Sequence, residues 1–310
     1  MSTLRELTPE LAKVAKDELG EVPSRIPADL LAIKEWLAKQ RHINARTDDQ
    51  WLIAFLRGCK YSLERTKEKL DNYHTMKTMV PEFSKAVDPM DPKVQQMIKL
   101  GISLILPKTA GPTGPRVIII RSGVYDPSQI TMLDNMGLNN MISAMLMLTD
   151  DNTVIAGQRY IIDMRNVTMA HLAQMTPATV KKMVMTGQES LPIREKGTHL
   201  INTPMGVETL FNLFKSFMNE KGKSRVFMHN EDMDALHKFV PKEILPTEYG
   251  GDGGSVQEII DHWKTKMESH KDWFIENGAH KTDESKRPGK PKTVENMFGI
   301  EGSFRKLNVD

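Results

Sequence analysis

The middle of this chain alternates short β-branched runs with longer amphipathic segments. The expected strands are residues 102–106, 116–121, 158–163, 197–201 and 225–228. Helical spacing marks residues 128–148, 177–188 and 204–218 between them. Connections of that length favour parallel strands, whereas the loop composition of residues 108–115 predicts a turn between the first two strands. The pattern predicts an α/β fold with a mixed, largely parallel five-stranded sheet flanked by helices.

Residues before this alternation show helical patterns only. Thr47 to Gln50 has capping-box spacing, and Ser62 is positioned to cap the next helix. Short connections between such helices predict a small antiparallel bundle. We expect a helical domain at 1–87, an α/β domain at 88–276 that closes with a helix over 255–275, and an irregular tail at 277–310. Three apolar residues are expected to dock this tail back onto the protein: Phe298, Ile300 and Phe304.

Charge and composition limit the cellular compartments and the binding partners that can be expected for this protein. The chain has 42 basic and 40 acidic residues, so the protein lacks the large positive net charge that would attract nucleic acid. The basic residues are also not interleaved with aromatic residues, as they often are in proteins that bind nucleic acid. Cys59 is the single cysteine and suits a reducing compartment. The charged N-terminus is unlike a signal peptide, and the longest apolar runs are too short to span a bilayer. These features predict a cytoplasmic protein.

The motifs of common α/β enzymes are missing from the sequence. There is no GxxxxGK[ST] phosphate loop, no GxGxxG after a strand and no GxSxG nucleophile elbow. His229, Glu231, Asp232 and Asp234 resemble metal ligands, but the composition of residues 230–234 is typical of a helix start. We therefore predict no enzymatic activity, no metal site and no cofactor.

Two features of the apolar residues each allow two interpretations. The 21 methionines fit either a methionine-rich core or a cavity that adapts to an apolar ligand. The helix at 204–218 has one wide apolar face, flanked by basic residues on both sides. Periodicity favours a core helix with a solvated basic rim, and the alternative is a lid over an apolar cavity beside an anionic membrane.

Several segments resemble the CRAL-TRIO lipid-binding family. Between residues 157 and 251 these are IIDMRNV, TPATVKKM, SLPIREKGTHLINTP, FKSFMNEKGKSRVFMH and ILPTEYGG. Upstream, DDQWLIAFLRGCKYSLERTKEKLDNYHTMK is similar to the helical domain of that family, and the ending FGIEGSFRKLNVD is similar to the tails of its insect members. The resemblance implies a cage for one hydrophobic molecule, closed by a mobile lid helix that opens at membranes.

The resemblance also implies residues for two kinds of site. The hydrophobic ligand would contact the methionine-rich segment, the strand at 158–162, the segment after the helix at 177–188, and the lid: Met141, Ser143, Met145, Gln158, Tyr160, Ile162, Leu191, Ile193, Val207, Leu210, Phe211, Phe214 and Met218. Phosphoinositides or another anionic membrane surface would contact basic residues: Lys60, Arg194, Lys196, Lys221, Lys223 and Arg225.

Two departures from tocopherol-transfer members of the family bear on specificity. Cys59 stands where they carry a second arginine, beside Lys60. Gln158 stands where they have an apolar wall residue, so its amide either points to solvent at the strand edge or hydrogen-bonds a ligand oxygen. The ligand could thus be a tocopherol, retinoid, carotenoid or other lipid. The leading hypothesis is transfer of a hydrophobic molecule by a protein that binds membranes transiently; the alternatives are a membrane-recruited interaction module with a vestigial cavity and an α/β enzyme.

Overall fold

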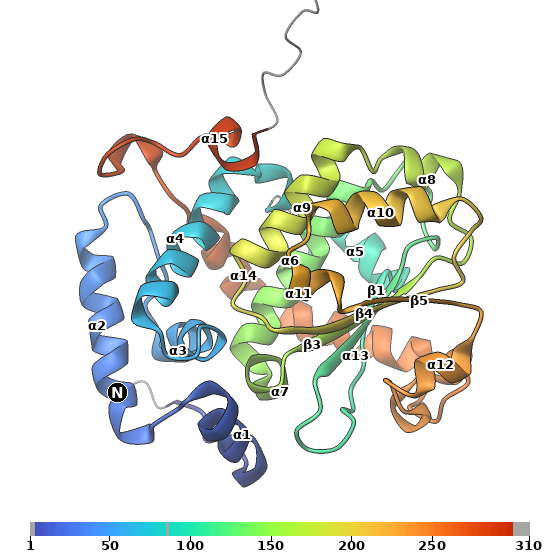
Figure 1. Ribbon diagram of the computed structural model, residues 1–310, viewed down its shortest axis with the longest axis horizontal. Helices are drawn as coiled ribbons and strands as arrows, with labels where there is room; N and C mark the ends of the chain where they lie inside the picture. Colours follow the sequence, from blue (N-terminus) through green and yellow to red (C-terminus); the bar gives the residue numbers. More distant parts are fainter. Residues whose placement is uncertain (1–3, 85–86, 300–310) are drawn as a thin grey trace, which may run out of the picture.

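A computed structural model describes residues 4–84 and 87–299, and these residues form a sheet with helices on both faces (Figure 1). The described strands are β1 (Ser103–Ile105), β2 (Arg116–Arg121), β3 (Gln158–Asp163), β4 (Glu195–Ile201) and β5 (Val226–Asn230). They lie in the order β1-β2-β3-β4-β5, with β1 antiparallel to β2 and the remaining neighbours parallel. The predicted α/β fold with a mixed, largely parallel five-stranded sheet is confirmed.

The helices before the sheet form the expected helical region. They are α1 (Pro9–Leu19), η1 (Pro23–Arg25), α2 (Ile26–Lys39), α3 (Asp49–Gly58), α4 (Leu63–Met79), η2 (Pro81–Phe83) and α5 (Pro92–Lys99). Ser62 caps α4 as predicted, but α3 has no capping box, because Asp48 itself accepts the hydrogen bond from the Trp51 amide. Trp51 and Phe55 of α3 are fully buried at the centre of this region.

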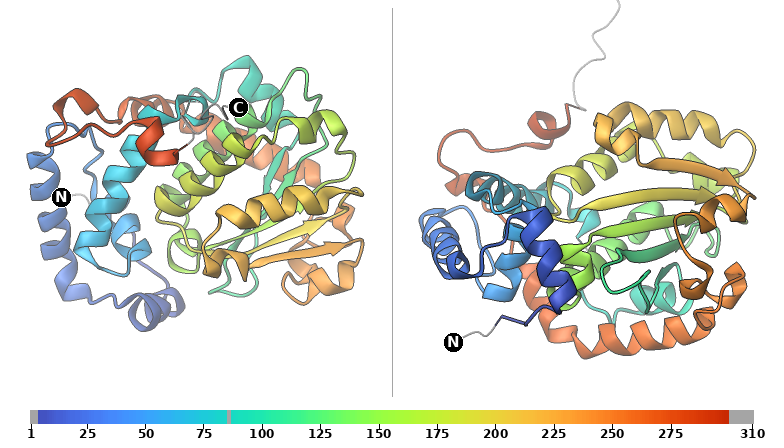
Figure 2. Two further views of the ribbon diagram at one scale, coloured as in Figure 1. Left: turned by 45° about the horizontal axis from the view of Figure 1, so that its top comes forward. Right: turned by 60° about the horizontal axis from the view of Figure 1, so that its bottom comes forward.

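The helices between and after the strands cover the two faces of the sheet. Their bounds are α6 (Met132–Thr149), α7 (Asp151–Ile155), α8 (Met169–Ala173), α9 (Pro177–Glu189), α10 (Val207–Phe217), α11 (Glu220–Lys223), α12 (Met233–His237), η3 (Lys242–Ile244), η4 (Thr247–Tyr249), α13 (Val256–Ser269) and α14 (Lys271–Ala279). Figures 1 and 2 show α9 and α10 on one side of the sheet and α12 and α13 on the other. The closing helix expected over 255–275 is in fact two helices, because the chain turns at His270.

The chain after α14 packs back onto the helical region. It contains η5 (Glu284–Lys286) and α15 (Val294–Phe298), so this part of the tail is less irregular than the composition indicates. Arg287 donates to both carboxylate oxygens of Asp71 on α4, at 2.9 and 2.8 Å. Phe298 is buried with Met76 of α4 and with Val80 just after that helix, which confirms the predicted docking of that residue. Ile300, Phe304 and most of the ending quoted above lie outside the described residues.

Alternation along the strands gives the sheet two different faces. Tyr160 on β3 lies beside Thr198 on β4, which lies beside Val226 on β5, and all three point to the same face. This is the face of α6, because the hydroxyls of Tyr160 and Ser143 are hydrogen-bonded to each other. On the opposite face, His199 packs against Phe239. Because Phe239 packs on the opposite face, a ligand cavity is expected on the face toward α6.

Candidate functional site

A pocket lies where the helical region, α6, α9 and α14 meet, and we call it the junction pocket. Its volume is about 60 Å³. It is lined by Tyr73, Met76, Lys77, Val80, Ser84, Val87, Asn140, Met141, Ala144, Thr186, Ser190, Leu191, Phe274, Asn277 and Gly278. Met141 and Leu191 are thus the two predicted ligand contacts that border it. The α4 and α14 residues of this lining were not singled out from the sequence, because only the tertiary structure brings those helices together.

Gln158 is fully buried, so the expectation that its amide points to solvent at the strand edge is wrong. The Tyr160 hydroxyl donates to its side-chain oxygen at 2.5 Å, while the amide nitrogen has no partner among the described residues. Burial raises the pKa of Tyr160, and the hydrogen bond with Ser143 opposes that rise. The second expectation, a hydrogen bond to a ligand oxygen, stays a prediction that the unpaired amide nitrogen favours.

An apolar stretch of the sheet is only partly covered, although it faces the α6 side. We call it the half-covered face, and it consists of Tyr160, Ile162, Thr198, Leu200, Val226 and Met228, all of which keep part of their surface accessible. By contrast, the residues of β4 that point the other way, Gly197, His199 and Ile201, are buried. Sequence reasoning named Tyr160 and Ile162 but missed the β4 and β5 members, which strand alternation together with parallel register would have indicated.

The helix expected to be a lid begins at Val207 rather than at residue 204, because Gly206 adopts a left-handed conformation that starts it. Val207 is the buried residue of α10. The rest of its predicted apolar face is only partly covered: Leu210, Phe211, Phe214 and Met218. α10 packs against α9, where the Lys181 ammonium lies 5.9 Å from the Phe217 ring centre. This helix is therefore held by less buried surface than α3, whose residues 51–57 are all buried.

The remaining predicted ligand contacts lie on two other parts of the structure. Met145 is fully buried on α6 within the core of the sheet domain. Ile193 packs instead against the apolar cluster of α2, α3 and α4. The loop carrying it lies against the end of α3, where a Cβ at Gly58 would be 2.0 Å from the Pro192 carbonyl oxygen. Only glycine at position 58 permits this approach of the helical region to the loop before β4.

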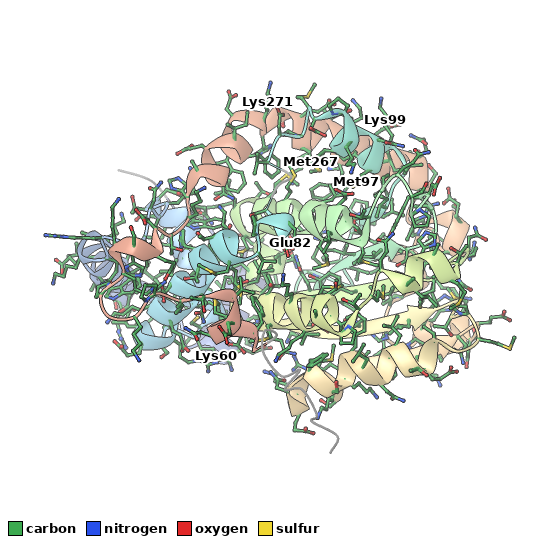
Figure 3. The ribbon with its side chains drawn as sticks, turned by 90° about the horizontal axis from the view of Figure 1, so that it is seen from above. Lys60, Glu82, Met97, Lys99, Met267 and Lys271 are labelled. Atoms are coloured by element: carbon green, nitrogen blue, oxygen red, sulfur yellow. The ribbon has the colours of Figure 1, made fainter. Side chains whose placement is uncertain are left out.

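The predicted basic residues gather into one surface patch, although they come from distant segments. The pKa of Lys221 is lowered first by Arg225, then by burial and by the charges of Lys60, Arg194 and Arg65. We define the basic patch as Lys60, Arg65, Arg194, Lys196, Lys221, Lys223 and Arg225. Arg65 was missed from the sequence, where it is one of several charged residues on a polar helix. Figure 3 shows Lys60 on the side of the molecule where α10 and α11 lie.

Several of these cations already have partners within the protein. Glu18 on α1 lies 3.2 Å from Arg194 and 3.7 Å from Lys196. Lys223 pairs with Glu220 at 2.6 Å, and Arg225 donates to the Glu195 carbonyl oxygen. In the described part of the chain, no carboxylate is paired with Lys60, Arg65 or Lys221, and all three are exposed. These three residues are therefore the most available for an external anion.

Two of the candidate metal ligands near β5, His229 and Asp232, make contacts within the fold. The Asp232 side chain accepts from the Ala235 amide at 2.9 Å and caps α12, as the sequence predicted. His229 stacks on His199, and the distance from His199 Nδ1 to His229 Nε2 is 2.8 Å. Residues 4–84 and 87–299 contain no group of three or more His, Cys, Asp or Glu side chains arranged to hold a metal ion. Within the same residues, no helix is long and apolar enough to cross a membrane.

Comparisons with known proteins show what this chain is similar to. A model described as CRAL/TRIO domain matches residues 102–251, and one described as Pinta-like, UBA domain matches residues 22–94. Proteins named alpha-tocopherol transfer protein-like from Homo sapiens and Pongo abelii are 28% identical over 270 residues, covering 87% of this chain and 77% of theirs. Clavesin-2 from Rattus norvegicus is 25% identical over 301 residues, covering 95% and 90%. A solved structure titled "Crystal structure of Sfh5" has a TM-score of 0.48 at 13% identity, covering 85% of this chain and 98% of that one.

Proposed function

We propose that the protein binds one hydrophobic small molecule internally and transfers it between membranes, and the match of residues 102–251 to the CRAL/TRIO domain model supports this proposal. The single observation that carries the proposal is the half-covered face. An apolar sheet surface that faces packed helices yet stays partly accessible is expected to be filled by a ligand, which would remove it from water at roughly 25 cal/mol per Å². The proposal assigns no catalytic residue, and it places the protein in the cytoplasm with transient attachment to membranes.

The proposal includes the division expected from the sequence, with a helical domain at 1–87, a ligand-binding domain at 88–276 and a tail from 277. The ligand would contact the residues predicted for it on α6, β3 and α10. Relatives named alpha-tocopherol transfer protein-like support a tocopherol, and the proposal keeps a retinoid, carotenoid or other lipid as further candidates. The buried polar pair of Gln158 and Tyr160 favours a ligand that carries an oxygen.

The lid proposal gives a testable prediction about α10. Because Val207 is its buried residue and its aromatic face is only partly covered, its amides should exchange with solvent faster than those of α3. Hydrogen–deuterium exchange read by mass spectrometry measures both helices in one sample. Vesicles with anionic lipid should accelerate exchange in α10 while leaving α3 unchanged. Protection of α10 equal to that of α3, with and without vesicles, would contradict a moving lid.

The small volume of the junction pocket favours a second candidate function. A drug-sized ligand usually occupies a pocket of roughly 300–1,000 Å³, whereas this one measures about 60 Å³. A protein whose cavity is vestigial could still be recruited to anionic membranes through the basic patch and act there as an interaction module. Membrane binding is expected from both functions, so only the ligand separates them.

Organic extraction of the purified protein followed by mass spectrometry tests the transfer function directly. We expect about one lipid per chain, because an internal ligand is retained through purification in water. Leu200→Trp, which adds bulk on the half-covered face, should abolish its recovery. Leu31→Trp is the matched control, because Leu31 on α2 is 57% exposed to solvent. Absence of stoichiometric lipid, together with no binding of lipophilic probes, would leave the interaction module as the better function.

A further inference from the structure

Lys77 borders the junction pocket from the last turn of α4. Its ammonium donates a hydrogen bond to the Asn277 carbonyl oxygen near the end of α14 and lies 5.4 Å from the centre of the Tyr73 ring. An ammonium has three N–H groups, and the Asn277 carbonyl uses one of them. The group is therefore held at the edge of the pocket with further donor capacity.

The charge of Lys77 has no counter-ion in the described part of the chain. Burial is the largest cause that lowers the pKa of Lys77, to about 7, and the charges that add to this effect are the cations Arg46 and Lys281. Arg57 is buried and Arg116 is half-buried, but they face Glu21 and Asp150 at 2.8 and 2.7 Å. Lys77 is half-buried, and an ammonium that packing shields from water without a carboxylate is costly, so the site favours either loss of the proton or arrival of an anion.

The remaining lining makes a purely inorganic anion a poor match. Around Lys77, the pocket presents Met76, Val80, Met141, Leu191 and Phe274, which offer apolar surface for carbon. The hydroxyls of Ser84, Thr186 and Ser190 also line the pocket, but each already donates a hydrogen bond within the protein instead of serving phosphate or sulfate oxygens. We propose that the junction pocket receives the carboxylate head of an amphipathic acid, such as a long-chain fatty acid, with Lys77 as its counter-ion. This inference rests on the proposed function, because the chain of such an acid needs the internal apolar space.

A carboxylate at Lys77 would form a charge-assisted hydrogen bond in a site of low dielectric, which strengthens the pair. Several other charged or titratable groups surround it, from α4, the segment before α3, and the chain after α14: Arg46, Tyr73, His74, His280 and Lys281. The Glu276 carboxylate pairs with Arg46 at 3.3 Å. Burial lowers the pKa of His74 to about 3 and raises that of Tyr73 to about 12. Burial also lowers the pKa of His280. These histidines and Tyr73 therefore stay neutral between pH 7 and 9, while Lys77 loses its charge.

The test compares dodecanoic acid with dodecanol, which share a chain and differ in the head, in competition with a neutral lipophilic fluorophore below their aggregation concentrations. At pH 7 we expect the acid to bind at least tenfold more tightly than the alcohol. The affinity for the acid should fall by up to tenfold per pH unit above 7, because the anion must then bind with uptake of a proton by Lys77. Lys77→Met should remove the preference, and Lys67→Met, on the same helix but paired with Glu64, should keep it.

Each outcome decides the inference. Equal binding of acid and alcohol, or a preference that survives in Lys77→Met, would overturn the carboxylate site while leaving the transfer function intact. Competition by acetate as strong as that by dodecanoic acid would overturn the amphipathic ligand. Binding of neither probe nor the fluorophore would overturn both this inference and the proposed function. If Lys77→Met does not fold, the pH series on the parent protein is decisive, and an affinity for the acid that does not change between pH 7 and 9 refutes the proposal.

Discussion

Replacing Glu21 by alanine is expected to lower the free energy of unfolding by about 3–5 kcal/mol, because it leaves a buried arginine without its counter-charge. The Glu21 carboxylate accepts from Arg57 at 2.8 and 3.2 Å and from the Tyr61 hydroxyl at 2.7 Å. The side chains of Glu21 and Arg57 are only 8% and 4% exposed. Neither water nor salt can therefore replace the lost carboxylate. Denaturant unfolding followed by circular dichroism measures the effect.

Two variants show whether this cost comes from the unpaired charge. Glu64→Ala removes a carboxylate that pairs with Lys67 but is 85% exposed, and it should change stability by less than about 1 kcal/mol. The double variant Glu21→Leu, Arg57→Leu removes both charges and should recover most of the loss. If the double variant is as unstable as Glu21→Ala, the lost hydrogen bond to Tyr61 or altered packing must account for the effect instead.

Changing Lys60, Lys221 and Arg225 to glutamine is expected to weaken binding to anionic vesicles by about 100-fold. A basic residue near an anionic surface contributes about 1 kcal/mol, and these three lie within one patch where their charges act together. Each of these three residues also lacks a paired carboxylate in residues 4–84 and 87–299, and Arg225 donates instead to a backbone carbonyl oxygen. Sedimentation with vesicles that contain phosphoinositide measures the loss, and the affinity of the parent protein should also fall as salt is raised.

The control variant removes three positive charges from the surface outside the basic patch. Lys39, Lys99 and Lys271 are exposed, and Figure 3 shows Lys99 and Lys271 on the side of the molecule opposite Lys60. Their triple change to glutamine should weaken vesicle binding by less than about threefold. An equal loss in both variants would mean that net charge, rather than the basic patch, attracts the protein to the membrane. Ligand extraction from the patch variant should still recover lipid.

Much of the secondary structure could be predicted because local sequence determines it. β3 occupies the predicted residues, and α9 begins after Thr176, whose side chain caps it by accepting from the Thr179 amide. Local patterns failed where the chain makes a turn without a proline or glycine signal. At His270 the apolar spacing continues from α13 into α14, so periodicity alone indicated one helix.

The candidate site could be predicted only in part. The resemblance indicated Met141 and Leu191, which do border the junction pocket. It did not indicate Lys77, because a lysine on a polar helix has the same local pattern whether water or another helix covers it. Gln158 illustrates the same limit, since alternation predicted its face but not its burial or its hydrogen bond with Tyr160.

By itself, the sequence determined the order of helices and strands, the parallel character of the sheet and the family resemblance, because periodicity, caps and connection lengths are properties of short segments. Only the tertiary structure decided which distant residues share a surface or a pocket. It placed Glu18 beside Arg194, gathered the basic patch from three parts of the chain, and left Lys77 facing cations rather than a carboxylate. Burial and charge pairing depend on the packing of segments far apart in sequence, and those contacts decide which side chains remain available to a ligand.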